Sequence, residues 1–176
     1  MENEAKIAVE MLKHGKGKVL DVGTGSARMA AALSKYGYNV VSIEYDIDIL
    51  KKAEENLKKE GNIDNIVLIH GDAHELPFLD ETFDVVVTYN AMHHMKDYKR
   101  VLDEMVRVCR KDGYILVTEL NEKGKEFVDR KHHERGENHE AKLNINDITE
   151  YLEEKFALTG EIKHSKYTDI FLCKKI

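Results

Sequence analysis

Two acidic residues and two glycines occupy positions at which a parallel sheet could hold a nucleotide-type cofactor. The stretch Lys18–Met29 begins as a short apolar strand, carries Asp21 near its end, and turns through Gly23 and Gly25 into a helix-forming run. Glycines let the chain turn tightly and let a ligand lie against bare backbone, while the N-terminus of the following helix offers free N–H groups. Glu44, the second acid, ends the next apolar run. These residue types in this order indicate the entry to a cofactor site.

The residues around these glycines argue against a dinucleotide. The dinucleotide fingerprint G-x-G-x-x-G requires a third glycine, and Arg28 stands in its place. A bulky residue at that position prevents close packing of the helix on the strand. Asp21, just before the first glycine, is also poorly suited to an anionic pyrophosphate, whereas a carboxylate suits a ligand with a cationic group.

Several motifs, in order along nearly the whole chain, resemble those of the class I S-adenosylmethionine-dependent methyltransferases. Asp21–Ala27 resembles the family's glycine-rich first motif, with Ala27 in place of the third glycine. The other matching positions are Glu44 at the end of the second strand, Gly71-Asp72-Ala73, Phe83–Val87 and Val106–Leu116. Within the last stretch, Asp112 replaces the family's proline and Tyr114 one of its glycines. The chain looks most like the small single-domain, quinone-biosynthesis-type enzymes that methylate small molecules.

The resemblance implies S-adenosylmethionine as the cofactor and suggests roles for the acidic residues. By likeness to the family, Glu44 would hold both ribose hydroxyls, Asp72 the adenine amino group, and Asp21 the ammonium group, directly or through water. The candidate cofactor-binding residues are Asp21, Gly23, Thr24, Gly25, Glu44, Tyr45, Asp72, Ala73 and Asn90. The residues alone leave other roles open: a solvated strand end for Glu44, a loop or N-cap acid for Asp72, and a buried acid satisfied by backbone N–H groups for Asp21.

The fourth predicted strand runs into Tyr89–Met95, which contains the adjacent histidines His93 and His94. The carboxyl end of this strand should lie beside the cofactor's methyl group, because ligands bind there in open parallel sheets. The stretch lacks the (Asn/Asp)-Pro-Pro-(Tyr/Phe) motif of enzymes that methylate amino groups of bases and amides, and it resembles the hydrophobe-His-His of small-molecule methyltransferases. His93 or His94 is therefore a candidate catalytic residue that orients the substrate or acts as a base near neutral pH. The alternative is a histidine that packs on the cofactor or caps backbone groups.

A second histidine-rich stretch, Lys131–Glu140, follows the fifth predicted strand. Its His132, His133 and His139 are candidate substrate-contacting residues, and its histidines and glutamates are also of the types that bind divalent metals. The spacing matches no standard metal site, and a glycine interrupts any helix that would align the outer histidines, so we predict no metal. We interpret residues 121–144 as a polar, irregular segment that forms a solvated, mobile lid or substrate loop.

Hydrophobic periodicity supplies the elements that must position these residues. Helices are expected at Glu2–Leu12, Arg28–Lys35, Ile47–Lys59 and Asp97–Arg110, with another beginning at Asn146. Strands are expected at Val19–Val22, Asn39–Glu44, Ile66–His70, Phe83–Tyr89, Tyr114–Leu120, and near Leu158–Lys163 and Thr168–Cys173. The helical stripe expected to face the core in the third helix is Ile49, Leu50, Ala53 and Leu57.

Strand and helix alternate through five repeats, which predicts a doubly wound, mostly parallel sheet with helices on both faces. The near-continuous apolar run Phe83–Tyr89 favours a strand covered on both faces. A short connection at His164–Tyr167 makes one of the last two strands antiparallel. The expected fold is α/β: a seven-stranded Rossmann-like sheet with one antiparallel strand near the C-terminus, in a single domain over residues 1–176.

Composition, net charge and cysteine content indicate the class of protein, its cellular compartment and the kind of partner it has. Its residues are 42% hydrophobic and 34% charged, and no apolar run approaches the ~20 residues that cross a bilayer. The N-terminus shows no signal-peptide pattern and the two cysteines match no metal or redox spacing, so we expect buried thiols and a cytoplasmic location. A net charge of −6 argues against nucleic acid as a partner. Enrichment in lysine and glutamate fits either a thermophile or plain codon bias.

We expect an enzyme that transfers a methyl group from S-adenosylmethionine to a small-molecule acceptor by in-line displacement. The cofactor carries the activation, so the protein mainly aligns the reacting atoms and needs a base only for a protonated nucleophile. Two alternatives stay open: an RNA or protein methyltransferase, and a non-catalytic cofactor-binding partner subunit. No large insertion is available to roof a substrate, so either a partner (a second copy in a homo-oligomer, or a partner subunit) or the segment 121–144 must complete the pocket. Oxygen, nitrogen, carbon and sulfur acceptors are not separated by these residues.

Overall fold

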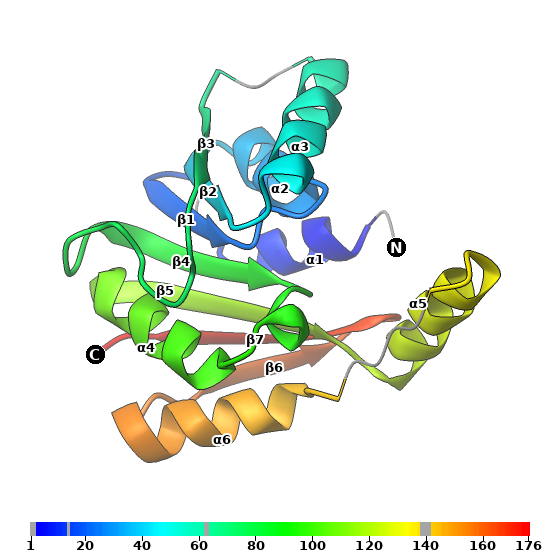
Figure 1. Cartoon of the computed structure of the whole chain (residues 1–176). Helices are drawn as coiled ribbons and strands as arrows, with labels where there is room; N and C mark the ends of the chain where they lie inside the picture. Colours follow the sequence, from blue (N-terminus) through cyan, green and yellow to red (C-terminus); the bar gives the residue numbers. More distant parts are fainter. Residues whose placement is uncertain (1–2, 14, 62–63, 138–141) are drawn as a thin grey trace.

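The sheet at the centre of the chain has seven strands in the order β3-β2-β1-β4-β5-β7-β6 (Figure 1). The computed structural model describes residues 3–13, 15–61, 64–137 and 142–176. The strands are β1 Lys18–Val22, β2 Asn39–Glu44, β3 Ile66–His70, β4 Phe83–Tyr89, β5 Cys109–Leu120, β6 Gly160–His164 and β7 Thr168–Lys174. The helices are α1 Glu4–Met11, α2 Arg28–Lys35, α3 Ile47–Glu60, α4 Tyr98–Val108, α5 Glu122–Glu134 and α6 Ile145–Phe156, with a 3₁₀ turn, η1, at Met92–His94.

Strand direction follows the connections between the strands. The first five strands lie parallel to one another, and β7 runs antiparallel to both of its neighbours, β5 and β6. The short turn between β6 and β7 forces this reversal. Strand β4 lies between β1 and β5 and is buried along Val85–Thr88, as its apolar run predicts. The predicted fold class, a mostly parallel seven-stranded sheet with one antiparallel strand near the C-terminus, is confirmed.

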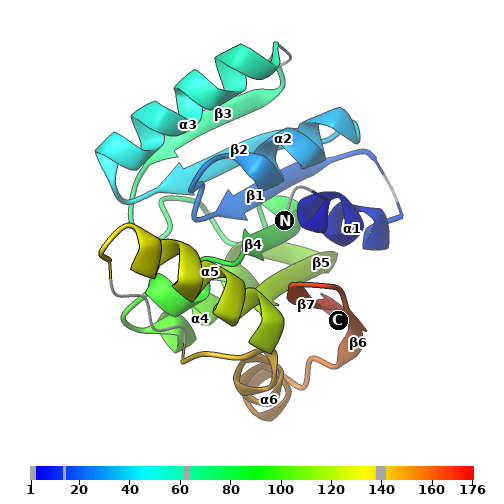
Figure 2. The same ribbon diagram turned by 90° about the vertical axis from the view of Figure 1, so that its right-hand side faces the viewer.

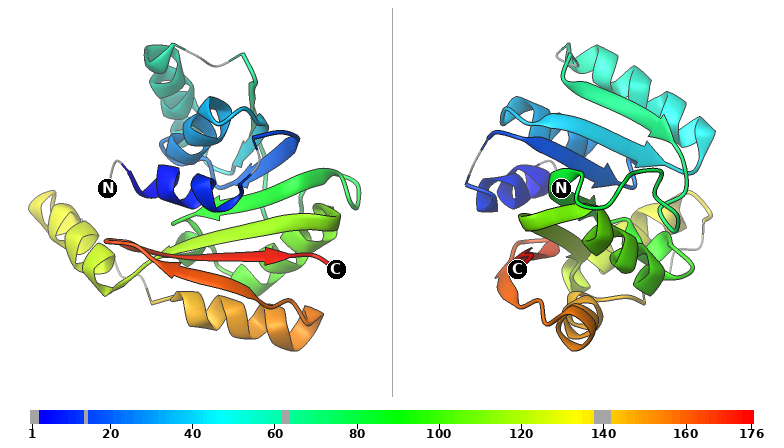
Figure 3. Two further views of the ribbon diagram at one scale, coloured as in Figure 1. Left: turned by 180° about the vertical axis from the view of Figure 1, so that it is seen from behind. Right: turned by 90° about the vertical axis from the view of Figure 1, so that its left-hand side faces the viewer.

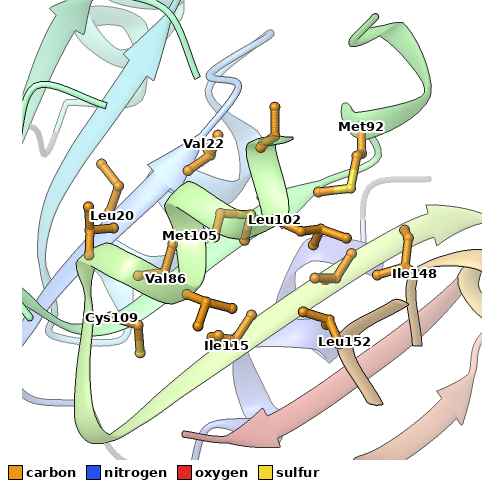
Figure 4. Packing of buried hydrophobic residues seen from close by; sticks show 14 of the residues in the cluster. Leu20, Val22, Val86, Met92, Leu102, Met105, Cys109, Ile115, Ile148 and Leu152 are labelled. Carbon is orange, nitrogen blue, oxygen red and sulfur yellow. The ribbon is translucent and has the colours of Figure 1, made fainter. Parts of the chain in front are cut away.

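Helices cover both faces of the sheet (Figure 2). Helices α1, α2 and α3 pack on one face, against side chains such as Val19 and Val85. Helices α4 and α6 pack on the opposite face, against side chains such as Leu20 and Val86 (Figures 3 and 4). Successive strand residues point to opposite faces, so β1, β2, β4, β5 and β7 each contribute to both cores. Burial of each such side chain contributes about 1.5–3 kcal/mol, which holds the strand ends in a fixed arrangement.

The register brings the carboxyl ends of the parallel strands to one edge. Val22, the last residue of β1, pairs with Ile43 of β2 and Thr88 of β4. Glu44 at the end of β2 pairs with His70 at the end of β3. The loops that follow β1, β2, β3 and β4 therefore start side by side, where open parallel sheets bind their ligands.

The expectation of an irregular segment over residues 121–144 is wrong, because α5 occupies Glu122–Glu134. Asn121 caps this helix, accepting a hydrogen bond from the Gly124 N–H at 3.0 Å. Gly124 is the only buried residue of α5, and charged side chains lie all around the helix. No apolar stripe was available for periodicity to detect.

Three smaller expectations also need correction. The strand–helix alternation stops between β3 and β4, which are joined by loop 71–82 without a helix. Strand β5 begins at Cys109 rather than Tyr114, since Cys109 already pairs with Phe83. Ile49 is 40% exposed, because it stands at the edge of the helical stripe; only Leu50, Ala53 and Leu57 of α3 are buried.

Two expectations from composition can be set against the structure. Among the described residues, no helix has both the length and the apolar character needed to cross a bilayer. Cys109 and Cys173 are buried free thiols, as predicted. Burial raises the pKa of both thiols to about 12, so neither is a reactive thiolate at neutral pH.

Candidate active site

A cavity of about 860 Å³ opens at the carboxyl ends of β1, β2, β3 and β4. Nine residues that the sequence singles out line it: Gly23, Thr24, Gly25, Glu44, Tyr45, Asp72, Ala73, Asn90 and His94. Four others do not line it: Asp21, His93, His132 and His133. His139 lies outside the described residues. The wall also contains residues that the sequence did not assign to the site: Arg28, Ile49, His74, Tyr89, Met95 and Lys96.

The glycine turn after β1 leaves bare backbone on the cavity wall. Gly23 has φ +86°, and a Cβ there would lie 2.8 Å from the Ala91 side chain. Gly25 has φ +52°, and a Cβ there would meet nothing within 4 Å, so this position faces open space. Ala27, at the family's third glycine position, has φ +65° and is the N-cap of α2. A left-handed alanine costs about 1 kcal/mol and offers no side-chain cap, so the first N–H groups of α2 keep their capacity to bind.

Glu44 is held in place by backbone N–H groups. Its Oε2 accepts from the Gly25 N–H at 3.0 Å, and its Oε1 accepts from the N–H groups of Tyr45 at 3.0 Å and Asp46 at 3.1 Å. Asp46 in turn caps α3, accepting from two N–H groups of its first turn. The carboxylate is half-buried and faces the cavity. It therefore ties the glycine turn to the end of β2 and presents a fixed acceptor to a ligand.

Asp21 lies beneath the glycine turn, fully buried. Its Oδ2 accepts from the Ser42 hydroxyl at 2.7 Å, and the Ser42 and Thr24 hydroxyls are also 2.7 Å apart. Its Oδ1 has no partner in the described part of the chain. Burial raises the pKa of Asp21 to about 7, against the lowering effect of the Ser42 hydrogen bond, and Glu44 raises it further. Asp21 thus reaches the cavity wall only through Ser42 and Thr24.

Asp72 belongs to a loop that side chains of α4 hold in place. Its Oδ1 accepts from the His74 backbone N–H at 2.8 Å and bonds the His74 ring at 2.7 Å, which lowers the pKa of Asp72. Arg100 Nε donates to the His74 carbonyl at 3.1 Å. Arg107 donates to the carbonyls of Leu76 and Phe78 further along the loop. These hydrogen bonds hold the loop between β3 and β4 in place, although it contains no helix.

At the end of β4, three buried polar atoms lack partners among the described residues, and two of them, on Tyr89 and Asn90, belong to residues that line the cavity. Asn90 has φ +48°, donates its N–H to the Thr118 carbonyl at 3.0 Å, and accepts from the Thr118 hydroxyl at 3.0 Å. The Asn90 Nδ2 and the Tyr89 hydroxyl are buried and unpaired within the described residues. Burial raises the pKa of Tyr89 to about 12, with a lowering contribution from Arg28. Both residues line the cavity, so a ligand is the available partner for these atoms.

The two histidines after β4 have different surroundings. The His93 side chain is 3% exposed, and its Nδ1 lies 2.7 Å from Oε2 of Glu119, whose side chain is 1% exposed. Glu119 Oε1 accepts from the Met92 N–H at 3.0 Å. His94 lines the cavity, and its ring centroid lies 4.1 Å from that of His93. Sequence reasoning missed Glu119, although an acid inside the apolar run of β5 was a signal for it.

The histidines of α5 lie apart from this arrangement. His132 Nδ1 contacts Glu137 Oε2 at 2.6 Å, with side chains 32% and 57% exposed. Helix α5 projects from the end of β5 away from the sheet (Figure 1). Across the ranges that the structure describes, no group of three or more His, Cys, Asp or Glu residues could hold a metal ion.

Comparison with known proteins gives consistent relatives. A family profile described as "Methyltransferase domain" matches residues 20–117. A demethylmenaquinone methyltransferase of Alkalihalophilus pseudofirmus is 38% identical over 106 residues, covering 58% of this chain and 44% of that protein. An uncharacterised methyltransferase of Bacillus subtilis is 29% identical over 102 residues, covering 58% of this chain and 40% of that protein. These matches span less than half of the relatives' length.

Solved structures share the fold over nearly the whole chain. The crystal structure of a putative methyltransferase from Bacillus halodurans has a TM-score of 0.76 at 21% identity, covering 98% of this chain and 99% of that one. That of a SAM-dependent methyltransferase from Aquifex aeolicus has a TM-score of 0.75 at 21% identity, covering 99% and 95%.

Proposed function

The chain belongs to the class I S-adenosylmethionine-dependent methyltransferases, and from this premise we propose that it transfers a methyl group from S-adenosylmethionine to a small-molecule acceptor. The observation that carries the proposal is the cavity at the strand ends. Fixed acceptors and bare glycine backbone line one part of its wall, and His94 and Asn90 line another. A cofactor and a second small reactant can therefore meet in it.

The residues present fit this cofactor. Glu44, already oriented by three backbone N–H groups, accepts from the ribose hydroxyls, and Asp72 accepts from the adenine amino group. Tyr45 and Ile49, 72% and 40% exposed, supply apolar surface beside them. The open space at Gly25 admits the amino-acid end of the cofactor.

In this proposal, the Asp21 carboxylate stabilises the ammonium group of the cofactor from its position beneath the glycine turn. Its carboxyl is buried and does not line the cavity, so the effect passes through the Thr24 hydroxyl or a water molecule rather than through direct contact. A cation nearby favours the ionised form of Asp21, which burial disfavours in the free protein.

When bound, S-adenosylmethionine supplies a methyl carbon activated by its positively charged sulfur, which leaves as a neutral thioether. The acceptor's lone pair forms the new bond to that carbon. His94, on the cavity wall, takes up the acceptor's proton or orients the acceptor. His93 packs on His94 and is a positioning residue, because the buried Glu119 fixes its ring. An acceptor that is already anionic needs no base.

A small-molecule acceptor is favoured by three observations. The segment after β4 lacks the Pro-Pro motif of base and amide methylators, the net charge is −6, and several relatives are named demethylmenaquinone methyltransferases. Helix α5 serves as a lid on the acceptor side in this proposal, and the side chains of His132 and His133 are not needed for the transfer step. We place the reaction in the cytoplasm, in a chain that folds as one domain.

Calorimetry with S-adenosylmethionine and S-adenosylhomocysteine tests cofactor binding. Glu44→Ala should weaken binding by about 1–3 kcal/mol, because it leaves the ribose hydroxyls without their acceptor. Glu55→Ala, on the exposed face of α3, is the matched control and should leave affinity unchanged. No binding at millimolar ligand would refute the proposal, and unchanged affinity in Glu44→Ala would refute the ribose position.

The acceptor class needs a separate experiment. Methyl-labelled S-adenosylmethionine is incubated with the protein and with metabolite, RNA or protein fractions of a cell extract. Label in the metabolite fraction supports the proposal, and label in RNA or protein identifies one of the other acceptor classes. Cofactor binding without transfer to any fraction supports a non-catalytic partner subunit.

A further inference from the structure

Strand β6 forms one edge of the sheet and leaves that edge open. Among the described residues it pairs only with β7, and all of its residues, Gly160–His164, are exposed. Figure 3 shows β6 at the border of the molecule, beyond β7. Helix α6 packs on β5 and β7. An open edge offers unpaired backbone groups to another strand.

The turn between β6 and β7 determines which backbone groups face outward. The Ser165 N–H donates to the Thr168 carbonyl at 2.8 Å, so these two residues form a hydrogen-bonded pair. Hydrogen-bonded and non-bonded pairs alternate along an antiparallel ladder. Counting back from Ser165, residues 163 and 161 bond β7. The N–H and C=O groups of Gly160, Ile162 and His164 therefore point away from the sheet.

The charges of β6 favour one self-pairing over its neighbours. Glu161 and Lys163 lie on the same face of the strand, flanking Ile162. An antiparallel two-fold centred on Ile162 places Glu161 of each copy opposite Lys163 of the other. Shifting the centre to Glu161 or to Lys163 places like charges opposite each other, which is unfavourable in cross-strand pairs. Only the register centred on Ile162 joins the outward backbone groups and pairs opposite charges.

We propose that two copies of this chain associate through β6, by an antiparallel pairing centred on Ile162 that continues the sheet from one copy into the other. The outward N–H and C=O groups of Ile162 bond their counterparts in the partner, and those of Gly160 bond those of His164. Glu161 and Lys163 form two symmetric ion pairs on one face. The occupant is a second copy, because the sequence of the strand is complementary to itself.

This association is independent of the methyltransferase reaction. The cavity lies at the ends of β1 to β4, and β5 and β7 separate those strands from β6. A five-residue strand pair buries less surface than a standard protein interface, so the dimer should form at high protein concentration and dissociate on dilution.

Charge exchange between two variants gives the sharpest test. In a homodimer, Glu161→Lys places two lysines opposite each other, and Lys163→Glu places two glutamates together. Each variant alone should weaken self-association by about tenfold, as measured by analytical ultracentrifugation. Mixed together, they should form a heterodimer about as readily as the wild type forms its homodimer. The double variant Glu161→Lys/Lys163→Glu should restore the homodimer and serves as the matched control.

A backbone variant tests the pairing itself. Ile162→Pro removes an N–H that points away from β7, so the fold is retained and the dimer is lost. A thermal melt and calorimetry with S-adenosylmethionine check that the variant is folded. A wild-type chain that stays monomeric at every concentration overturns the proposal. So does a dimer that survives Ile162→Pro and ignores the charge changes.

Discussion

Among the residues that the structure describes, two histidine–glutamate pairs have nearly the same contact distance and opposite surroundings. His93 and Glu119 meet at 2.7 Å with side chains 3% and 1% exposed. His132 and Glu137 meet at 2.6 Å with side chains 32% and 57% exposed. The first pair sits between β4 and β5 beside the cavity, and the second at the end of α5. Contact distance alone does not separate them.

Burial does separate them. An exposed ion pair contributes little to the free energy of unfolding, because water solvates each partner equally well when the two separate. A buried pair loses its water, so removing one partner leaves the other with an unmet polar group. Glu119 also accepts the Met92 N–H, which ties the 3₁₀ turn of His93 and His94 to β5. We expect function to follow burial and proximity to the cavity rather than the number of histidines.

The largest difference should appear in activity. His94→Gln should lower the rate of methyl transfer by about 10²–10⁴-fold, because glutamine cannot take up the acceptor's proton. His133→Gln, in the last turn of α5, is the matched control and should change the rate less than about twofold. The readout is transfer of labelled methyl into the metabolite acceptor. Equal losses in both variants would contradict the distinction between the histidines beside the cavity and those of α5.

The next difference should appear in stability. Glu119→Ala should lower the free energy of unfolding by about 3 kcal/mol, because the His93 Nδ1 and the Met92 N–H lose their buried acceptor. Glu137→Ala should change it by less than about 0.5 kcal/mol. Urea denaturation of both variants measures the two values.

A third variant, Glu119→Gln, keeps an acceptor oxygen and tests whether the carboxylate orients His93. If this variant is folded but inactive, the carboxylate orients His93. If it is fully active, that positioning role is wrong.

The buried Asp21 carboxyl shows the effect of burial on stability at a site without a histidine. Its pKa in the folded chain, about 7, lies above the ordinary aspartate value of about 4. Its contribution to stability is therefore fully present below about pH 4 and is lost as the pH rises through about 7. Between these limits the wild type should lose about 1–4 kcal/mol more than Asp21→Asn does.

Denaturation midpoints recorded from pH 4 to pH 9 give that difference directly. Asp48→Asn, an exposed acid on α3, is the control, and its profile should run parallel to that of the wild type. A parallel profile for Asp21→Asn would show that Asp21 is ionised at a normal pH in the folded chain.

Periodicity predicted the sheet because β1, β2 and β4 are apolar and their partners follow in order. The glycine motif and the acid at the end of β2, rather than periodicity, singled out Gly23, Gly25 and Glu44, which line the cavity. Whether those residues bind the cofactor stays a prediction. Helix α5 escaped notice because its stability comes from a cap and charged side chains rather than an apolar stripe.

Other parts of the site depend on contacts between distant segments. Glu119 stands 26 residues after His93, and only the pairing of β4 with β5 brings them together. Arg28 counted in the sequence as an obstacle to one cofactor, whereas in the structure it lines the cavity. The acid inside the apolar run of β5 was a local signal for Glu119, but only the register of the sheet places it beside His93, and Arg28 is placed by the glycine turn that begins α2.

The lack of buried side chains in α5 has a consequence for how this protein can diverge. Among the residues of this helix, Gly124 alone is buried, against the Tyr167 carbonyl. Substitutions at its exposed positions should therefore change the free energy of unfolding by less than about 0.5 kcal/mol, whereas Phe127 still packs on the Tyr167 ring. The exposed surface of the helix can be altered by substitution with little effect on folding, unlike the buried strands β5 and β7.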